Sequence, residues 1–510
     1  MDAALVAKKK KLLSFPSAFT ILFFIMILAI AATWIVPAGA YSKLSYNAEK
    51  HVLEVVDPHG QLSTLPATQD SLDKIKIHIQ IEEFTEGKIN KPIAVPGTYE
   101  RLEQSPKKLS DLTISMVDGI IEGANIMVFI FILGGFIGVV NKTGAFNSGL
   151  LALSRKTKGK EFLLVFLVVV LMVLGGTTCG LEEEAVAFYP ILVPVFLALG
   201  YDSIVCVGAI FLAASMGTTF STINPFSVVI ASSAAGIPFT EGIGFRTFGC
   251  IVGTAAVVSY LYWYCKKVKA DPTFSYTYDD HEDFQKRFPV NIDPATIGPM
   301  GVRKILVLTL FAAAFPVMIW GVYVGGWWFP QMAASFLAIA IVVMFICGLS
   351  EHESTEAFVH GASGLVGVSL IIGLARGVNM IMEEGMISDT VLHFASNAVA
   401  GMEGSLFVVA LLIVFFLLGF IVPSSSGLAV LAMPIMAPLA DTVELPRYLV
   451  VSAYNWGQYA MLYLAPTGLV LATLQMLGMN YNHWLKFVLP MVGFLLAFAS
   501  ILLVVQVWLA

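Results

Sequence analysis

A polar segment at 175–184 separates two hydrophobic runs in the first half of the chain. It contains two glycines, two threonines and three consecutive glutamates, and apolar runs over 162–174 and 185–199 flank it. Each run is shorter than the roughly 20 apolar residues that span a bilayer. Irregular backbone at membrane depth is tolerated only where protein buries it or where it lines a watery cavity. The pattern therefore predicts a re-entrant hairpin over 162–199 with a functional polar tip.

A second segment repeats this pattern in the other half. Residues 419–427, which include a proline and three consecutive serines, lie between the apolar runs 406–418 and 428–439. The prolines that follow each tip are also spaced alike, at 190 and 194 and at 434 and 438. The sequence therefore predicts a second hairpin over 405–440 and an internal repeat of the kind that marks the binding site of a secondary transporter. Two membrane halves can also look alike merely because both are apolar, but that alternative explains neither the proline spacing nor the recurring tip.

Each predicted hairpin is followed by a long apolar stretch with a break inside it. Pro225 interrupts the first stretch and Pro466 the second. A proline inside a helix removes one backbone donor and frees carbonyl groups of the preceding turn. We therefore expect two broken helices whose free ends meet the hairpin tips at mid-membrane.

The composition fixes the class of protein. The chain has 510 residues, of which 57% are hydrophobic and 13% charged. This favours an all-α polytopic membrane protein. Lys8–Lys11 precede the first apolar run, which places the N-terminus in the cytoplasm. With that start, the short lysine-rich loops all fall on the cytoplasmic side and the second repeat has the opposite orientation to the first, so the repeat is inverted. The net charge of −6 says little about partners, and we expect no nucleic-acid partner.

Changes in polarity divide the chain into six predicted parts. Alternation of polar residues with isoleucine over 74–81 indicates strands, so we expect the polar segment before the second helix to be a small β-rich extracytoplasmic insertion. The parts are the N-terminus with helix 1 (1–41), the insertion (42–110), the first repeat (111–265), a cytoplasmic linker (266–304), a linking helix (305–325) and the second repeat (326–510).

Polar side chains at the two tips and the two breaks are the candidate substrate-binding residues. Helix N-terminal ends offer N–H groups to a carboxylate, and C-terminal ends offer carbonyls to a cation. Small polar residues also allow helices to pack closely, which is the competing interpretation. Gln458 and Tyr463 face the same space if the breaks are oriented as expected. The predicted set is Thr177, Thr178, Glu183, Glu184, Ser221, Thr222, Asn224, Ser424, Ser425, Ser426, Asn455 and Thr467.

Five charged residues lie in or near the predicted tips and helices. Glu182, Glu183 and Glu184 are about 100° apart on a helix, so we expect one of them to face the site. Arg376 follows a predicted helix over 361–374, and it either serves the site as a charge partner or extends to the outer interface. Glu122 is expected to pack or to cap a helix.

The motifs around these residues resemble the YfcC type of transporter. They are Gly175-Gly176-Thr177-Thr178, Glu183-Glu184, Ala187-Phe188-Tyr189-Pro190, Phe220-Ser221-Thr222-Ile223-Asn224-Pro225-Phe226-Ser227 and Val95-Pro96-Gly97-Thr98-Tyr99. That group is related to ArcD-like basic amino acid antiporters and to DcuC-type C4-dicarboxylate carriers. The resemblance covers nearly the whole chain. It implies a homodimer in the bacterial inner membrane, with a scaffold domain, a moving transport domain and an elevator mechanism. The paired Ser-Asn-Thr tips of the dicarboxylate and citrate branches are absent in that form.

These observations favour a secondary transporter of amino acids, with basic ones such as arginine or ornithine foremost. Clustered glutamates repel an anion and suit an ammonium or guanidinium group. A C4-dicarboxylate carrier coupled to Na⁺ or H⁺ is the alternative, and proton coupling is the competing role for Glu183 or Glu184. A serine hydrolase using the serines 424–426 lacks a matched base, and an inverted repeat suits alternating access better than a channel. No CxxC or Walker motif occurs, so we expect no metal site, no cofactor and no ATP hydrolysis, with Na⁺ or H⁺ as the only candidate coupling ions.

Overall fold

The structure of the protein is a computed structural model. It describes residues 18–77, 79–87, 89, 91–146, 148–149, 160–280, 284, 286, 300–325, 327–402 and 404–510, and for residues 184, 187, 191, 323 and 368 it describes the backbone only. The Lys8–Lys11 run, on which the predicted cytoplasmic N-terminus rests, lies outside these residues. Nine of the described helices are long and apolar enough to cross a membrane.

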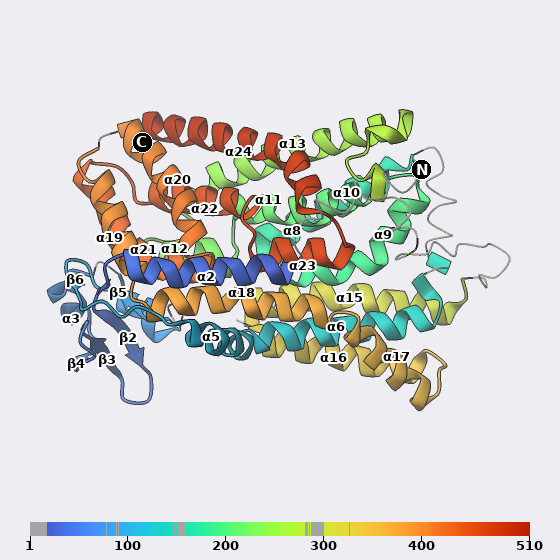
Figure 1. Ribbon diagram of the computed structural model, residues 1–510, viewed down its shortest axis with the longest axis horizontal. Coiled ribbons are helices and arrows are strands. Elements are labelled where there is room, and N and C mark those ends of the chain that lie inside the picture. Colours follow the sequence, from blue (N-terminus) through green and yellow to red (C-terminus); the bar gives the residue numbers. More distant parts are fainter. Residues whose placement is uncertain are drawn as a thin grey trace, which may run out of the picture.

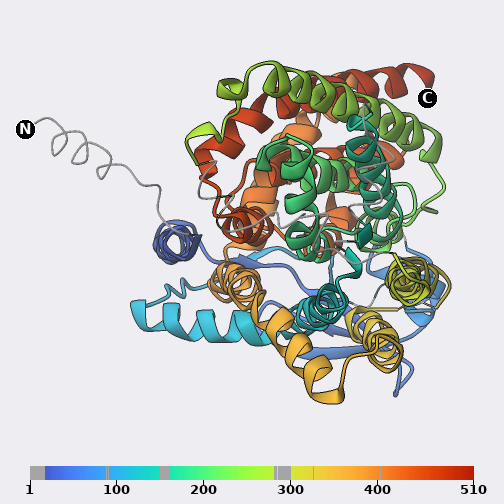
Figure 2. The same ribbon diagram turned by 90° about the vertical axis from the view of Figure 1, so that its right-hand side faces the viewer.

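The helices form two layers, which lie one above the other in Figures 1 and 2. We call them layer A and layer B. Layer A contains α2 (Ala18–Ile35), α5 (Leu109–Glu122), α6 (Ala124–Lys142), α15 (Val302–Gly325), α16 (Phe329–Ile346), α17 (Glu351–Ser363) and α18 (Val366–Glu384). Layer B contains α8 (Phe162–Cys179), η1 (Glu184–Phe188), α9 (Tyr189–Ala198), α10 (Ser203–Val207), η2 (Gly208–Leu212), α11 (Ala213–Thr219), η3 (Pro225–Val229), α12 (Ile230–Ala234), α13 (Ile243–Ala270), α20 (Gly404–Ile421), α21 (Ser425–Thr442), α22 (Tyr448–Leu462), α23 (Gly468–Leu477) and α24 (Tyr481–Leu509). The short helices η4 (Pro272–Phe274) and η5 (Tyr278–Asp280) follow α13, and α19 (Ser388–Val399) follows α18.

Glycines let the helices of layer A cross closely. A Cβ atom on Gly119 of α5 would lie 2.4 Å from the backbone nitrogen of Gly377 on α18. A Cβ atom on Gly138 of α6 would lie 2.3 Å from the carbonyl oxygen of Ala357 on α17. Only glycine permits backbones to approach this closely, as is common where membrane helices pack. Because Glu122 ends α5, this crossing brings it to Arg376.

Three of the four hairpin arms are longer than the sequence predicts, whereas the arm that contains α9 is not. Helix α8 runs to Cys179 instead of ending near residue 174, since its last turn includes the glycines and threonines assigned to the tip. Helices α20 and α21 each contain 18 residues, and all three are candidate membrane spans by length and composition. The shortness of the arms therefore no longer supports re-entrance, and the re-entrant course of both hairpins stays a prediction.

Both predicted helix breaks are confirmed. Helix α11 ends at Thr219, and helical structure resumes at Pro225. Helix α22 ends at Leu462, and α23 begins at Gly468. In each case the proline lies at the interruption, as expected from its missing backbone donor.

The polar segment between α2 and α5 folds into strands and short helices. A four-stranded antiparallel sheet has the order β4 (Leu62–Pro66), β3 (Val52–Val56), β2 (Lys43–Asn47) and β5 (Ile93–Ala94). Strands β1 (Gly39–Ala40) and β6 (Glu100–Arg101) form a separate pair. Which side of the membrane this segment occupies stays a prediction.

The prediction of strands over 74–81 is wrong. Helix α3 (Gln69–Lys74) and helix α4 (Ile81–Thr85) flank an irregular connection. Ile77 and Ile79 are both buried, so the alternating sequence corresponds to alternating burial. No strand pairs with the described residues of this stretch. Lys76 has a φ of 58°, which interrupts extended backbone.

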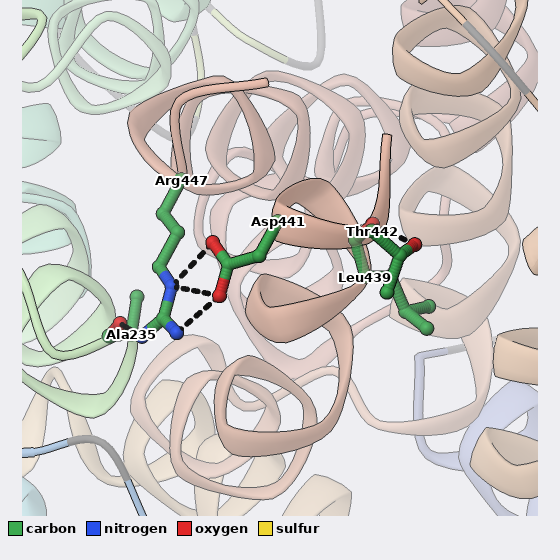
Figure 3. A network of polar contacts seen from close by, with 5 residues as sticks. All are labelled: Ala235, Leu439, Asp441, Thr442 and Arg447. Carbon is green, nitrogen blue, oxygen red and sulfur yellow. Dashed lines mark hydrogen bonds and ion pairs between the residues drawn. The ribbon is translucent and has the colours of Figure 1, made fainter. Parts of the chain in front are cut away.

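An ion pair joins the end of α21, in the second hairpin, to the residue that precedes α22 (Figure 3). The Arg447 Nε atom, just before α22, donates to Asp441 near the end of α21 at 2.9 and 3.1 Å. Its Nη1 atom also donates to the carbonyl of Ala235, which caps α12, at 2.9 Å. This one guanidinium therefore ties the second hairpin to the end of the first broken helix.

Candidate substrate site

A cavity of about 530 Å³ lies between the two layers. Layer A contributes residues of α2, the α5–α6 junction and α18. Layer B contributes both tips and both helix breaks. The polar and charged residues that line it are Lys91, Glu122, Asn125, Glu182, Glu183, Asn224, Arg376, Asn379, Ser424, Ser425, Ser426, Gln458, Tyr459 and Thr467.

The first tip is held by hydrogen bonds from its own broken helix. The Asn224 Nδ2 group donates to the carbonyl of Gly176 on α8 at 3.1 Å, and its Oδ1 atom accepts from the Phe226 amide at 2.8 Å. Asn224 thus caps the start of η3 and binds the last turn of α8 with one side chain. Gly180 ends α8 with a φ of +68°, and a Cβ atom there would lie 2.8 Å from Asn224 Nδ2. Glycine is therefore required at this cap for both conformation and space.

The second tip is held from outside its own hairpin. The Ser424 Oγ atom accepts from the Gly427 amide at 3.2 Å and caps α21. Tyr454 of α22 donates to the Ser425 carbonyl at 2.6 Å. Lys91, from the strand-containing segment, donates to Ser426 Oγ at 3.0 Å. The Ser425 Oγ atom also donates to the Phe226 carbonyl of η3 at 3.4 Å, so three of these four contacts are made with other elements of the chain.

Charges of both signs face the cavity. Glu182 and Glu183 follow the C-terminal end of α8, where carbonyl groups already favour a cation. Arg376 extends from α18 to Glu122, with Nη1 to Oε1 at 3.5 Å. Two carboxylates therefore form an acidic end at the first tip, and Arg376, whose charge acts on Glu183, lies between this end and Glu122.

Several polar atoms in the cavity wall are buried without a hydrogen-bond partner among the described residues. They are Arg376 Nε, Asn379 Oδ1, Gln458 Oε1 and Thr467 Oγ1. A buried polar atom without a partner costs about 1–3 kcal/mol. Such atoms in a cavity wall are suited to bind a polar ligand.

Seven predicted residues line the cavity, namely Glu183, Asn224, Ser424, Ser425, Ser426, Thr467 and Arg376. Arg376 lies inside α18, because that helix runs to Glu384 and does not end near residue 374 as predicted. The side chain of Glu184 lies outside the described part of the chain. No observation yet tests which of these residues bind substrate.

The other predicted residues form hydrogen bonds within the protein and lie outside the cavity wall. Thr177 accepts from the Thr222 amide at 3.0 Å, and their hydroxyls are 3.1 Å apart. Ser221 is bonded to Ser227 at 2.7 Å. Thr178 donates back to the Leu174 carbonyl at 2.6 Å. Asn455 donates to the Thr218 and Thr219 carbonyls at 3.4 Å. None of these five residues lines the cavity.

Sequence reasoning missed Lys91 and the contact between Glu122 and Arg376 in the cavity wall. Lys91 lies in a polar segment far from the hairpins, and Glu122 was expected only to pack or cap. The one available signal is the position of Glu122 directly before Gly123 and α6, where an ionisable residue borders a membrane helix.

A model of the DcuC family, described as C4-dicarboxylate anaerobic carriers, matches residues 15–508. The chain belongs to the DcuC family. This membership agrees with the resemblance that the sequence motifs indicate. The chain is 30% identical over 522 residues to the putative basic amino acid antiporter YfcC of Escherichia coli, covering 99% of this chain and 98% of the relative. It is 68% identical over 508 residues to an uncharacterized protein of Haemophilus influenzae, covering 99% of each.

Two solved transporters are similar to this DcuC-family chain at low identity. MtrF of Neisseria gonorrhoeae, described among antimetabolite efflux pumps, has 16% identity and a TM-score of 0.42 over 97% of this chain and 96% of its own. The YdaH transporter of Alcanivorax borkumensis has 14% identity and a TM-score of 0.41 over 96% and 98%. The family membership makes the protein a multi-pass membrane transporter with a small-molecule substrate.

Proposed function

We propose that the protein is a secondary active transporter of amino acids, with basic ones such as arginine and ornithine as its preferred substrates. The observation that carries this proposal is a single cavity with an acidic end and anion-binding groups. Glu182 and Glu183 would bind the guanidinium or ammonium group of the side chain. The starts of α21 and α23 would receive the α-carboxylate, since both helix N-termini border the cavity.

The charges of both signs that line the cavity favour an amphoteric ligand. One like charge about 4 Å away costs on the order of 4 kcal/mol at an effective dielectric constant near 20. An anion near Glu182 and Glu183 would be repelled by both carboxylates, whereas a cation would be attracted by both. The name of the Escherichia coli relative, a putative basic amino acid antiporter, supports the same substrate class.

A C4-dicarboxylate is the second candidate, and one observation favours it. Lys91 and Arg376 both line the cavity, so each carboxylate of such a substrate could meet one cation. The description of the family supports this class as well. Arg376 already has Glu122 as a partner, which makes it the weaker anion site of the two.

The transport cycle and its setting belong to the same proposal. An elevator movement of layer B along layer A would carry the cavity across the membrane, and the resemblance supports it. A homodimer in the bacterial inner membrane, with the N-terminus in the cytoplasm, is proposed on the same ground. Na⁺ or H⁺ would serve as the coupling ion unless the protein exchanges one amino acid for another.

A binding screen tests the substrate class. Purified protein is heated with arginine, ornithine, lysine, succinate or fumarate, each with and without Na⁺, and the unfolding midpoint is recorded. A ligand that binds only the folded state at about 100 times its Kd stabilises it by about 2.7 kcal/mol, which raises the midpoint measurably. The proposal expects shifts with basic amino acids. Shifts with succinate or fumarate alone would replace it with the dicarboxylate alternative.

The role of Glu183 is tested by Glu183→Gln. Direct recognition of the substrate cation predicts loss of equilibrium arginine binding. Proton coupling predicts that binding and counterflow persist while uptake driven by a pH gradient is lost. Glu184→Gln is measured in parallel, because the first-tip carboxylates follow one another in sequence.

A further inference from the structure

Lys91 differs from Arg376, the other cationic residue that lines the cavity, in having no carboxylate within ion-pair distance among the described residues. Its ammonium group donates to the neutral Ser426 hydroxyl at 3.0 Å. Lys91 forms no ion pair with any carboxylate in the part of the chain that the structure describes, whereas Arg376 contacts Glu122. The residue is half-buried and lines the cavity. Burial, and then the positive charge of Arg376, lower the pKa of Lys91, and the more distant charges of Glu122 and Glu383 oppose this only in part. A half-buried ammonium ion that is not in contact with a carboxylate is costly, and an anionic ligand would reduce that cost.

The segment that carries Lys91 is anchored on both sides of it. Ile89 and Ile93, two residues before and after Lys91, are both buried. Ile93 pairs with Leu44 of β2 in the four-stranded sheet. The position of the ammonium group is therefore set by packed backbone, and its long side chain extends from there to the second tip.

Polar contacts hold this strand-containing segment to the end of α18 and the start of α19. The Gly39 amide donates to the Met386 carbonyl at 2.9 Å, and the Lys43 ammonium is 2.9 Å from Asp389. Further contacts join the Tyr41 amide to Asp389 at 3.0 Å, Tyr99 to Thr390 at 2.9 Å and Lys107 to Glu384 at 2.9 Å. Among the described residues, its only polar contact with the second hairpin is the one from Lys91 to Ser426. The ammonium can therefore exchange Ser426 for a ligand without loss of the segment's other bonds.

We propose that Lys91 is a substrate-specificity residue that binds a carboxylate group of the transported molecule, so that the strand-containing segment forms part of the substrate site. This inference rests on the proposed function and assigns the substrate carboxylate a partner. The carboxylate replaces Ser426 as the acceptor of the Lys91 ammonium, while the cationic end of an amino acid lies at Glu182 and Glu183. A ligand without a carboxylate leaves Lys91 on Ser426.

The test compares arginine with agmatine, its analogue without the carboxylate, by equilibrium titration of full-length protein. For Lys91→Gln we expect arginine to bind roughly 10- to 150-fold more weakly, the range for one charge-assisted hydrogen bond. Agmatine affinity stays unchanged, and Lys91→Arg restores most of the arginine affinity. Lys50→Gln is the matched control, since Lys50 lies in the same segment with its side chain 67% exposed and pairs with Glu54. Equal arginine affinity in the wild type and Lys91→Gln would overturn the inference while the proposed function stands.

Two further results separate this inference from the proposed function. If the wild type binds succinate but no amino acid, the amino acid function fails. Weaker succinate binding by Lys91→Gln then keeps Lys91 as a carboxylate ligand, and equal binding rejects it. Absence of binding to either class rejects both proposals. Should Lys91→Gln fail to fold, acylation of lysines in the wild type, read by mass spectrometry, replaces it. Saturating arginine should then protect Lys91 and not Lys50, and equal labelling of Lys91 with and without arginine would contradict the inference.

Discussion

The two tips that meet at the cavity are held in different ways. The first tip is bonded to the adjacent break by the Asn224 side chain and by the Thr177 hydroxyl of α8, which accepts from the Thr222 amide. The second tip is bonded by Tyr454 and by Lys91, which is 335 residues away in sequence. The first tip is thus bonded within its own repeat, whereas one contact of the second tip, the one from Lys91, lies in the cavity wall where a ligand can replace it. We therefore expect the first tip to be the more rigid of the two and the second tip to adapt at Ser426.

A change in the packing of α8 against α11, next to the first tip, should give the largest effect that tests this difference. A Cβ atom on Gly176 would lie 2.0 Å from the Ala214 carbonyl of α11. Gly176→Ala should therefore force α8 from α11, and overpacking of this kind costs about 1–3 kcal/mol or more. We expect a lower unfolding midpoint and loss of ligand binding.

The control for this substitution is Gly493→Ala in α24, where a Cβ atom would meet nothing within 4 Å. It should leave the midpoint unchanged or raise it, because alanine is the better helix former by about 1 kcal/mol. Equal midpoints for the two variants would contradict the rigid first tip.

Removal of the Asn224 side chain should have the next largest effect. Asn224→Ala leaves the Phe226 amide without its partner and removes one of the two donors to the Gly176 carbonyl, at a cost of about 1–3 kcal/mol, or roughly 5- to 150-fold in ligand affinity. Titration with arginine measures it. Asn480→Ala is the control, since the Asn480 Oδ1 atom has no partner among the described residues. An unchanged arginine affinity in Asn224→Ala would make the break a packing kink only.

The smallest expected effect concerns the second tip. Tyr454→Phe removes one hydrogen bond to the Ser425 carbonyl, worth about 0.5–1.5 kcal/mol, and should change arginine affinity roughly 2- to 12-fold. Tyr260→Phe removes a similar bond, to the Phe487 carbonyl at 2.7 Å, away from the cavity. Both variants should lose similar stability, and only the first should alter affinity. A change in both, or in neither, would remove the distinction between the tips.

Local signals in the sequence identified both helix breaks and seven residues of the cavity. A proline acts on the turn that contains it, so Pro225 and Pro466 could be interpreted without the fold. The end of α18 could not be predicted, because apolar packing against α5 continues the helix past Arg376 to Glu384. Thr177, Thr222 and Ser221 have the residue types of a binding site but bond to neighbours instead.

Lys91 and the Glu122–Arg376 pair depend on contacts that no local pattern reveals. Glu122 and Arg376 are 254 residues apart and meet only because glycines let α5 and α18 cross. Lys91 reaches Ser426 only after the sheet of its segment has formed. The alternation over 74–81 shows the same limit, since it correctly indicates alternating burial but not hydrogen-bond pairing.

The central claim is that one cavity binds both ends of an amino acid, and calorimetric titration of the wild-type protein tests it most directly. Arginine is compared with agmatine, which lacks the carboxylate, and with norvaline, which lacks the guanidinium group. We expect arginine to bind at least about tenfold more tightly than either analogue, because each analogue loses one charge-assisted contact. If norvaline or agmatine binds as tightly as arginine, one end of the cavity takes no part in recognition and the cavity does not bind both ends of an amino acid.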